Sequence, residues 1–231
     1  MRTTVLIAAP LLVAGSLVAG CSRDREVSRP AALTPISPSH SRTATSEPGA
    51  TVSQTVTAAP PAGASSADAI AWVEAAGTAD TADFHIALRG VTSVSIGDDV
   101  AFTTPFGATC MTEVTRAPGL ACLVSLTDPP KQPPEVYGVW KGGWVDFDGT
   151  SVRIGSAHGD PGRFAAGRGA PLPTDRSLAF GDYRCRTGTT TLVCVNYAHR
   201  TAVRYSDGGV DAYVCARLSP PAAGIGIEYR C

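Results

Sequence analysis

The stretch SLAFGDYRCRTGTTTLVCVNY, residues 177–197, decides the fold. Two runs rich in apolar and aromatic residues, Ser177–Tyr183 and Leu192–Tyr197, flank a segment of Gly and Thr that is typical of a turn. One cysteine, Cys185, follows the first run, and another, Cys194, lies in the second. Two strands that carry one cysteine each predict a β-hairpin closed by a disulfide.

An earlier part of the chain has a similar pattern. AFTTPFGATC…LACLV, residues 101–124, and AFGDYRC…LVCVN, residues 179–196, share Ala-Phe, a turn, a cysteine, and then Leu-x-Cys followed by an aliphatic residue. The pattern predicts two similar hairpins packed into one sheet or barrel. An internal duplication is one explanation, and chance similarity over so few residues is the other.

The rest of residues 66–231 predicts one domain that begins with a helix and continues in strands. Ser65 or Ser66 is suited to cap the helix, Asp68 suits its positive end, and Gly77 is a natural stop. Further strands are expected at Val91–Ile96, Val100–Thr103, Leu120–Leu126, Trp144–Phe147, Ser151–Ile154, Ala202–Tyr205 and Val210–Val214. The Gly- and Pro-rich segment from Gly155 to Thr174 is expected to be a long surface loop. The predicted class is mainly β, or β-rich α+β: an antiparallel sheet or barrel of short, disulfide-stapled strands preceded by one N-terminal helix.

The seven cysteines form an odd set in a chain that carries an export signal. Removing Cys21 leaves an even set suited to three disulfides: Cys110, Cys122, Cys185, Cys194, Cys215 and Cys231. Their spacing favours sequential pairing, because each pair can then close one hairpin or short loop, although other connectivities stay open. No spacing typical of a zinc site is present, so neither a metal nor another cofactor is expected.

Residues 1–20 have the form of a secretory signal peptide. Arg2 precedes an apolar run, residues 5–19, that is too short for a comfortable transmembrane helix. The final VAGC, ending at Cys21, resembles a bacterial lipobox. In such signals the thiol receives a diacylglycerol through a thioether, and the freed amino group often receives a further acyl chain such as palmitate. The alternative is an ordinary signal peptide that ends near a free or disulfide-bonded cysteine.

Residues 21–65 are almost entirely Ala, Pro, Ser, Thr and Gly and contain no aromatic residue. This composition predicts a disordered tether between the anchor and the domain, because it cannot bury enough apolar surface to offset chain entropy. The tether is either a plain spacer or a carrier of O-linked glycans. The expected location is therefore outside the cytoplasm, at the outer face of the cell membrane, with the membrane as partner through Cys21.

The charges argue against a nucleic-acid partner. The chain has 19 Lys and Arg residues against 20 Asp and Glu residues, with a formal net charge of −1. A nucleic-acid-binding domain would need a clustered basic face, and no run of basic residues is present.

A family resemblance covers residues 66–231 and the lipobox. The segments FTTPFGATC…CLV…PP, WKGGWVDFDGTSVRIGSA and SLAFGDYRCR…LVCVNYAHRTAVRY resemble the LppI-type lipoproteins of mycobacteria. They are similar, more loosely, to actinobacterial exported domains built on F-x-S-P-S-G-N-x-x-C…C and C…G-x-x-C-x-N. This chain departs from the broader pattern at residues 106–109, where Ser-Gly-Asn is usual. The resemblance implies an exported location and a fold, and it assigns no activity.

The best candidate binding residues lie in YGVWKGGWVDF, where Tyr137, Trp140, Lys141 and Trp144 surround a pair of glycines. Aromatic faces stack on sugar rings or apolar ligands, and Lys141 adds a charge. The competing interpretation is that the indole rings fill the core with their N–H groups bonded.

The candidate catalytic groups are sparse, and no catalytic residue is expected. Asp146 and Asp148 resemble half of a calcium loop, or a pair of glycosidase carboxylates, but a turn explains them as well. Ser156 and His158 lie in GSAHG, which lacks the spacing of a nucleophile elbow. The remaining domain histidines, His85 and His199, show no metal-binding spacing.

The sequence therefore favours a non-catalytic, lipid-anchored envelope protein that binds a wall glycan, an envelope lipid or another protein. Two alternatives remain. One is a hydrolase of wall polymers that uses Asp146, Asp148 or His158, and the other is a purely structural surface module.

Overall fold

The computed structural model of the protein describes residues 58–158 and 162–231. The predicted signal peptide, Cys21 and the tether up to residue 57 lie outside these residues. In the part that the structure describes, no helix is both long and apolar enough to cross a membrane.

The predicted helix is confirmed as α1 (Ser66–Glu74). Its first turn is held by a capping box: the Ser65 hydroxyl oxygen accepts a bond from the Asp68 backbone N–H at 3.1 Å, and the Asp68 carboxylate accepts one from the Ser65 backbone N–H at 3.2 Å. Trp72 and Val73 are buried beneath the helix.

The strands form two open sheets, and the sheet form of the predicted fold is confirmed. The first sheet has the order β1 (Gly77–Thr78), β10 (Arg176–Phe180), β11 (Tyr183–Thr187), β12 (Leu192–Asn196), β13 (Thr201–Ser206) and β14 (Gly209–Tyr213). The second has the order β15 (Ala216–Leu218), β16 (Ile225–Arg230), β8 (Ser151–Ala157), β7 (Trp140–Phe147), β6 (Leu120–Leu123), β5 (Thr109–Thr112), β4 (Ala101–Thr103), β9 (Arg168–Pro171), β2 (Ile86–Arg89) and β3 (Thr92–Ser95). Two short 3-10 helices, η1 (Thr81–Phe84) and η2 (Gly162–Ala166), complete the fold.

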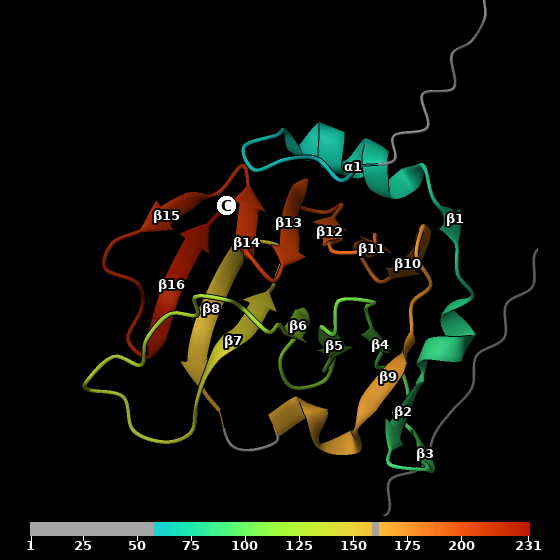
Figure 1. The fold of residues 1–231 in the computed structure, drawn as a ribbon, viewed down its shortest axis with the longest axis horizontal. Helices are drawn as coiled ribbons and strands as arrows, with labels where there is room; N and C mark the ends of the chain where they lie inside the picture. Colours follow the sequence, from blue (N-terminus) through green and yellow to red (C-terminus); the bar gives the residue numbers. More distant parts are fainter. Residues whose placement is uncertain (1–57, 159–161) are drawn as a thin grey trace, which may run out of the picture. The chain divides into compact units, whose positions relative to one another are not determined.

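The two sheets face each other (Figure 1), and one central core lies between them. Its buried side chains come from both sheets and include Phe102, Phe147, Leu178, Leu192 and Tyr205. Each sheet is also covered on its outer face. Helix α1 packs on β12 and β13 of the first sheet, and η2 packs on the second sheet.

The sequential disulfide pairing is confirmed for all three pairs. Cys110 and Cys122 stand directly opposite each other on β5 and β6, as Cys185 and Cys194 do on β11 and β12. The third disulfide, Cys215–Cys231, closes the hairpin formed by β15 and β16.

Three expectations need correction. The run Ser177–Tyr183 is not one strand, because the chain turns at Gly181, whose φ is +49°, and divides it into β10 and β11. The segment from Gly155 to Thr174 is not a loop throughout, because it contains the end of β8, then η2 and β9, and buries Phe164 and Leu172. The two similar hairpins lie in two facing sheets and not in one.

The packed part of the chain begins before residue 66. The Tyr213 hydroxyl donates to the Pro60 carbonyl oxygen at 2.7 Å, and Pro60 is buried. Ala59 and Ala64 pack against the cluster beneath α1. The last residues of the predicted tether therefore belong to the domain.

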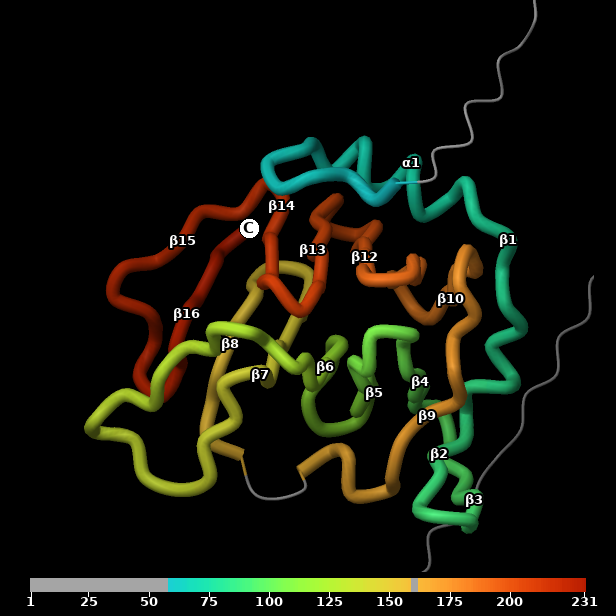
Figure 2. The backbone as a smooth tube through the Cα atoms, viewed as in Figure 1, coloured from blue at the N-terminus to red at the C-terminus, as the bar shows by residue number. Residues whose placement is uncertain are grey.

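The fold is an internal repeat with exchanged strands. Strands β4–β8 and β10–β14 form two five-stranded antiparallel meanders that can be followed in Figure 2. The first strand of each meander also pairs with a parallel strand, and these two strands are exchanged between the repeats. Strand β9, which precedes the second meander in the chain, pairs with β4 of the first. Strand β1, which precedes the first meander, pairs with β10 of the second. The covering helices α1 and η2 precede these two exchanged strands in the chain.

The registers of the two meanders correspond residue by residue. The disulfide Cys110–Cys122 occupies the place of Cys185–Cys194. Leu120 faces Phe147 where Leu192 faces Tyr205. The agreement extends over all five strands, so the similarity seen in the sequence reflects a repeated structural unit.

The buried and exposed disulfides predict different costs of removal. Replacing Cys185 and Cys194 by serine should lower the free energy of unfolding by roughly 2–4 kcal/mol through lost chain constraint, with a further penalty for two buried hydroxyls. Both cysteines are fully buried, whereas Cys215 is half-buried and Cys231 is exposed. The same change at Cys215 and Cys231 should cost less, although it opens the longer loop. Urea unfolding measures both, and an equal or greater cost at the C-terminal pair would contradict this account.

Candidate functional site

The four candidate binding residues do not form an aromatic platform. Trp144 is 1% exposed and packs in the core beneath η2, and its indole N–H has no partner among the described residues. Tyr137 is 90% exposed in the loop before β7. Trp140 and Lys141, both on β7, are half-buried. Trp144 is therefore not available to stack on a ligand, and the core interpretation holds for it.

Trp140 serves to fix the loop that precedes β7. Its indole N–H donates to the Pro130 carbonyl oxygen at 2.9 Å. The indole and Pro130 lie over Gly155, which has a φ of +75°. A Cβ at Gly155 would approach both rings to 2.7 Å, so only glycine leaves room for them.

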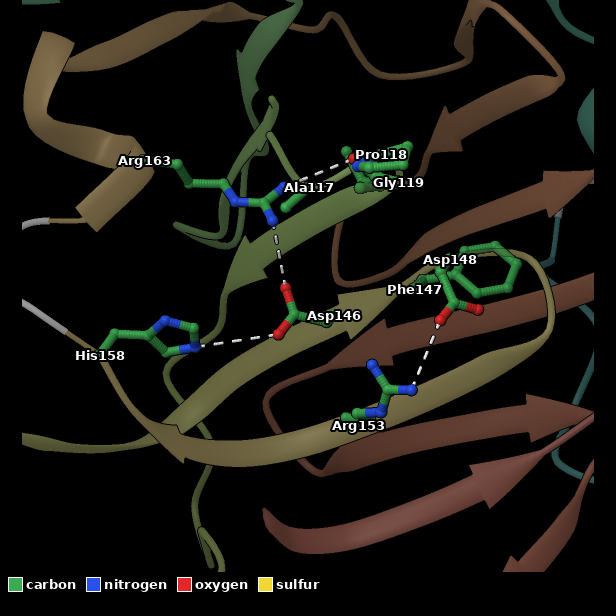
Figure 3. A pocket seen from close by; sticks show the side chains of 10 residues that line it. Ala117, Pro118, Gly119, Asp146, Phe147, Asp148, Arg153, His158 and Arg163 are labelled. Carbon is green, nitrogen blue, oxygen red and sulfur yellow. Dashed lines mark hydrogen bonds and ion pairs between the residues drawn. The ribbon is translucent and has the colours of Figure 1, made fainter. Parts of the chain in front are cut away.

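A cleft of about 290 Å³ lies on the outer face of the second sheet (Figure 3). Its lining residues come from the loop between β5 and β6, the start of β6, strands β7 and β8 with the residues that follow each, and η2: Ala117, Pro118, Gly119, Leu120, Asp146, Phe147, Asp148, Arg153, His158 and Arg163. Gly119, with a φ of +119°, lets the loop approach β7 closely, because a Cβ there would lie 2.8 Å from the Phe147 carbonyl oxygen. Asp146, Asp148 and His158 were singled out from the sequence, and the structure brings all three to one cleft.

Asp146 lies at the centre of the cleft. Its carboxylate is 3.8 Å from His158 Nε2 and 3.6 Å from Arg163 Nη2, and its side chain is 25% exposed. Both distances are too long for a hydrogen bond, and no other described residue bonds this carboxylate. Asp146 thus lies near two nitrogen groups, and neither of these described neighbours forms a hydrogen bond with it.

Arg163 approaches Asp146 from η2. Its side chain is 9% exposed, and its guanidinium also lies 3.5 Å from the Met111 carbonyl oxygen and 3.4 Å from that of Gly119. All of these contacts are long compared with the 2.7–2.9 Å of a strong charge-assisted bond. The guanidinium is therefore held in place while its N–H groups remain weakly bonded.

His158 forms the third side of this cluster. Its ring stacks on the Trp144 ring with centroids 3.7 Å apart and an interplanar angle of 21°. Its Nε2 is shielded from solvent and has no hydrogen bond within the described residues. Burial, aided by the charges of Arg163 and Lys141, lowers the pKa of His158 against the opposing effect of Asp146. The imidazole is accordingly neutral near pH 7.

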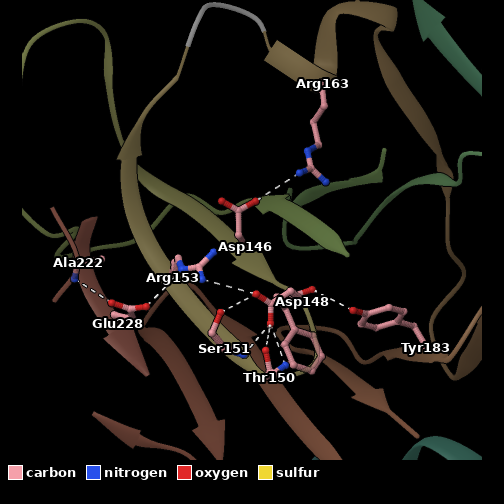
Figure 4. A network of polar contacts seen from close by, with 10 residues as sticks. Asp146, Asp148, Thr150, Ser151, Arg153, Arg163, Tyr183, Ala222 and Glu228 are labelled. Atoms are coloured by element: carbon pink, nitrogen blue, oxygen red, sulfur yellow. Dashed lines mark hydrogen bonds and ion pairs between the residues drawn. The ribbon is translucent and has the colours of Figure 1, made fainter. Parts of the chain in front are cut away.

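Asp148 is engaged in a turn (Figure 4). One carboxylate oxygen accepts bonds from the Thr150 N–H and hydroxyl and from the Ser151 N–H, at 2.7–2.9 Å, and the other accepts from the Ser151 hydroxyl at 2.7 Å. Burial alone would raise the pKa of Asp148, but these bonds outweigh it and lower the pKa. The turn interpretation therefore explains Asp148 better than the calcium or glycosidase one.

Arg153 is drawn away from Asp146. The two residues are cross-strand partners on β8 and β7. The Arg153 guanidinium instead lies 3.4 Å from Glu228 and 3.7 Å from Asp148. Glu228 is 2% exposed and also accepts a bond from the Ala222 N–H at 2.8 Å.

The other polar candidates lie outside the cleft. His85 Nδ1 is 2.8 Å from the Asp99 carbonyl oxygen, and the Asn196 side chain accepts a bond from the His199 N–H at 3.0 Å. Ser156 is buried and does not line the cleft with His158. Among the residues that the structure describes, no group of His, Cys, Asp or Glu side chains is arranged to hold a metal ion.

Sequence reasoning missed Arg163 and Arg153. Arg163 lies in the segment that was expected to be a surface loop, and Arg153 lies in the strand expected at Ser151–Ile154, where it was given no role. The alternation of charge in VDFDGTSVR, residues 145–153, is a signal that could have placed Asp146 and Arg153 on one face.

Comparison with known proteins gives no relative for this chain. No family model matches it, and neither a curated protein nor a solved structure is significantly similar.

The lowered pKa of His158 predicts a pH dependence of stability. As the pH falls below 6.5, the ordinary pKa of histidine, His158 is protonated in the unfolded chain before it is protonated in the folded protein. The free energy of unfolding should therefore fall as the pH drops below 6.5. His158→Phe keeps a flat ring against Trp144 and removes the titration. Wild-type protein should therefore lose more stability than the variant between pH 7 and pH 5 in urea unfolding. Superimposable pH profiles would show that His158 has no such effect.

Proposed function

We propose that the protein is a lipid-anchored, extracytoplasmic envelope protein that binds a ligand in the cleft around Asp146. Two features support the location. All six cysteines of the domain are paired, as expected in an oxidising compartment, and Cys21 remains for the lipobox. The resemblance to LppI-type lipoproteins agrees with this location and forms part of the proposal.

The observation that carries the binding function is the state of the charged groups in the cleft. Asp146 and Arg163 are positioned on a strand and a 3-10 helix, yet their contacts are 3.4–3.8 Å long. Groups that are held in place by long, weak contacts suit binding, because a ligand can form shorter bonds with them without the cost of reorganising them.

A lipid is the least suitable of the three predicted ligand types. The cleft is small and lined by five charged or titratable side chains: Asp146, Asp148, Arg153, His158 and Arg163. An acyl chain would strip water from these groups without replacing their bonds, which is costly.

A hydrolase is the second candidate, and one observation favours it. His158 is neutral and its Nε2 lies 3.8 Å from the Asp146 carboxylate, so the two side chains have the composition of a general base paired with a carboxylate. The glycosidase version would need a second available carboxyl group, and Asp148 is occupied by its turn. Binding without turnover needs no catalytic group beyond those present in the cleft. A purely structural module would give the cleft no function.

Lipidation of Cys21 gives the first test of the proposal. Mature protein purified from its native membrane should begin at Cys21 and carry the mass of a diacylglycerol with or without a further acyl chain. Two or three chains anchor a protein stably, whereas one chain anchors it only marginally. Cys21→Ser should therefore shift the protein from the detergent phase to the aqueous phase in phase partitioning. An unmodified Cys21, or a membrane fraction unchanged by the substitution, would refute the anchor.

A further inference from the structure

The internal repeat offers a comparison for the cleft within the same molecule. A second cleft, of about 320 Å³, lies at the corresponding place on the outer face of the first sheet, between β13, the β11–β12 turn and α1. Arg204 lines it in the position that Asp146 has in the first meander, because Arg204 faces Asp211 across β13 and β14 as Asp146 faces Arg153 across β7 and β8.

The two clefts differ in how their charges are satisfied. Arg204 and Asp211 bond directly to each other at 2.7 Å. Asp146 and Arg153 do not, because Arg153 turns to Glu228 and Asp148. The cross-strand pair is thus joined by a short ion pair in the second repeat and is separated in the first, where Asp146 faces Arg163 and His158. In the first cleft, therefore, the two cross-strand residues do not form the ion pair that their counterparts form in the second.

The charge balance of the first cleft selects a neutral ligand. Two arginines, Arg153 and Arg163, are matched by two carboxylates, Asp146 and Asp148. An anion would meet both carboxylates and a cation would meet both guanidinium groups at short range, and like charges in a partly desolvated cleft repel strongly. A hydroxyl group meets neither obstacle, because it donates to a carboxylate and accepts from a guanidinium.

We infer that the cleft around Asp146 binds a single neutral sugar residue of a glycan. Adjacent hydroxyls of the sugar donate to Asp146 and accept from Arg163, and so complete the bonds that the protein leaves long. The Pro118 and Ala117 side chains give an apolar edge for the C–H face of the ring. A cleft of about 290 Å³ lies at the lower end of small-molecule sites, which fits one sugar unit and not a longer segment. This inference rests on the proposed binding function and names its ligand class.

The test uses the full mature protein in a detergent that contains no sugar. Titration calorimetry is carried out with D-glucose, D-mannose, D-galactose, D-arabinose and N-acetyl-D-glucosamine and with their short linear oligomers. Inorganic phosphate and Ca²⁺ serve as the anionic and cationic probes. The intrinsic tryptophan emission is followed in parallel, because one of the three tryptophans, Trp144, stacks on His158, which borders the cleft.

We expect at least one sugar series to bind saturably and to be unaffected by phosphate. Asp146→Asn keeps the size of the side chain and removes a charged acceptor, so binding should weaken about tenfold or more. Asp211→Asn is the matched control in the second repeat, with a similar side-chain exposure of 32% against 25%, and should change binding less than twofold. Both variants are compared at matched fraction folded by thermal unfolding.

The outcomes separate the sugar inference from the proposed function. Binding of phosphate or Ca²⁺ that Asp146→Asn alters, with no sugar bound, overturns the ligand class and leaves the binding function standing. Sugar binding weakened equally by Asp146→Asn and Asp211→Asn overturns the site. If no probe binds, the sugar inference fails, and the binding function is tested by incubating wild-type protein and Asp146→Asn with an envelope fraction. Retention of that fraction by wild type alone supports binding in the cleft, whereas equal behaviour of the two proteins contradicts it.

Discussion

The structure depends on the register of two facing meanders. In each, a disulfide joins directly opposed residues of neighbouring strands, Cys110–Cys122 and Cys185–Cys194, in the middle of the shared core. A slip of one residue would turn every inward side chain outward, and the covalent link forbids it. With Val145 and Phe147 fixed inward, the residue between them, Asp146, is fixed outward on the face that carries the cleft.

The exchanged strands explain why the cleft needs both repeats. Asp146 belongs to the first meander, whereas Arg163 lies on η2, which leads through β9 into the second. Helix α1 likewise precedes the first meander in the chain but packs on the outer face of the second. One copy of the repeat would lack both its cover and its edge strand. The pairing of the repeats therefore creates the hollow between sheet and helix in which the charged groups meet.

Local patterns in the sequence predicted the structural features that depend on residues close together in the chain. The helix cap at Ser65 or Ser66, the three sequential disulfides and most of the strands follow from the spacing of a few residues. The site depends on distant contacts, which such patterns do not contain. Asp146 and His158 were visible as separate candidates, but Arg163 lies in a Gly-rich segment without periodicity. For Trp144 both ligand binding and core packing stayed open, because nothing near it in the sequence shows that Phe164 and η2 cover its ring.

The C-terminal hairpin gives a physical reason why the two clefts differ. Strand β14 is the edge of the first sheet, and within residues 58–158 and 162–231 Asp211 pairs with Arg204 alone. Strand β8 has a further neighbour, β16, whose Glu228 stands opposite Arg153 and is almost fully buried. A buried carboxylate without a cation would be strongly destabilising, so Arg153 is committed to Glu228. Asp146 is thereby left with long contacts, and the hairpin closed by Cys215–Cys231 opens a polar cleft two strands away.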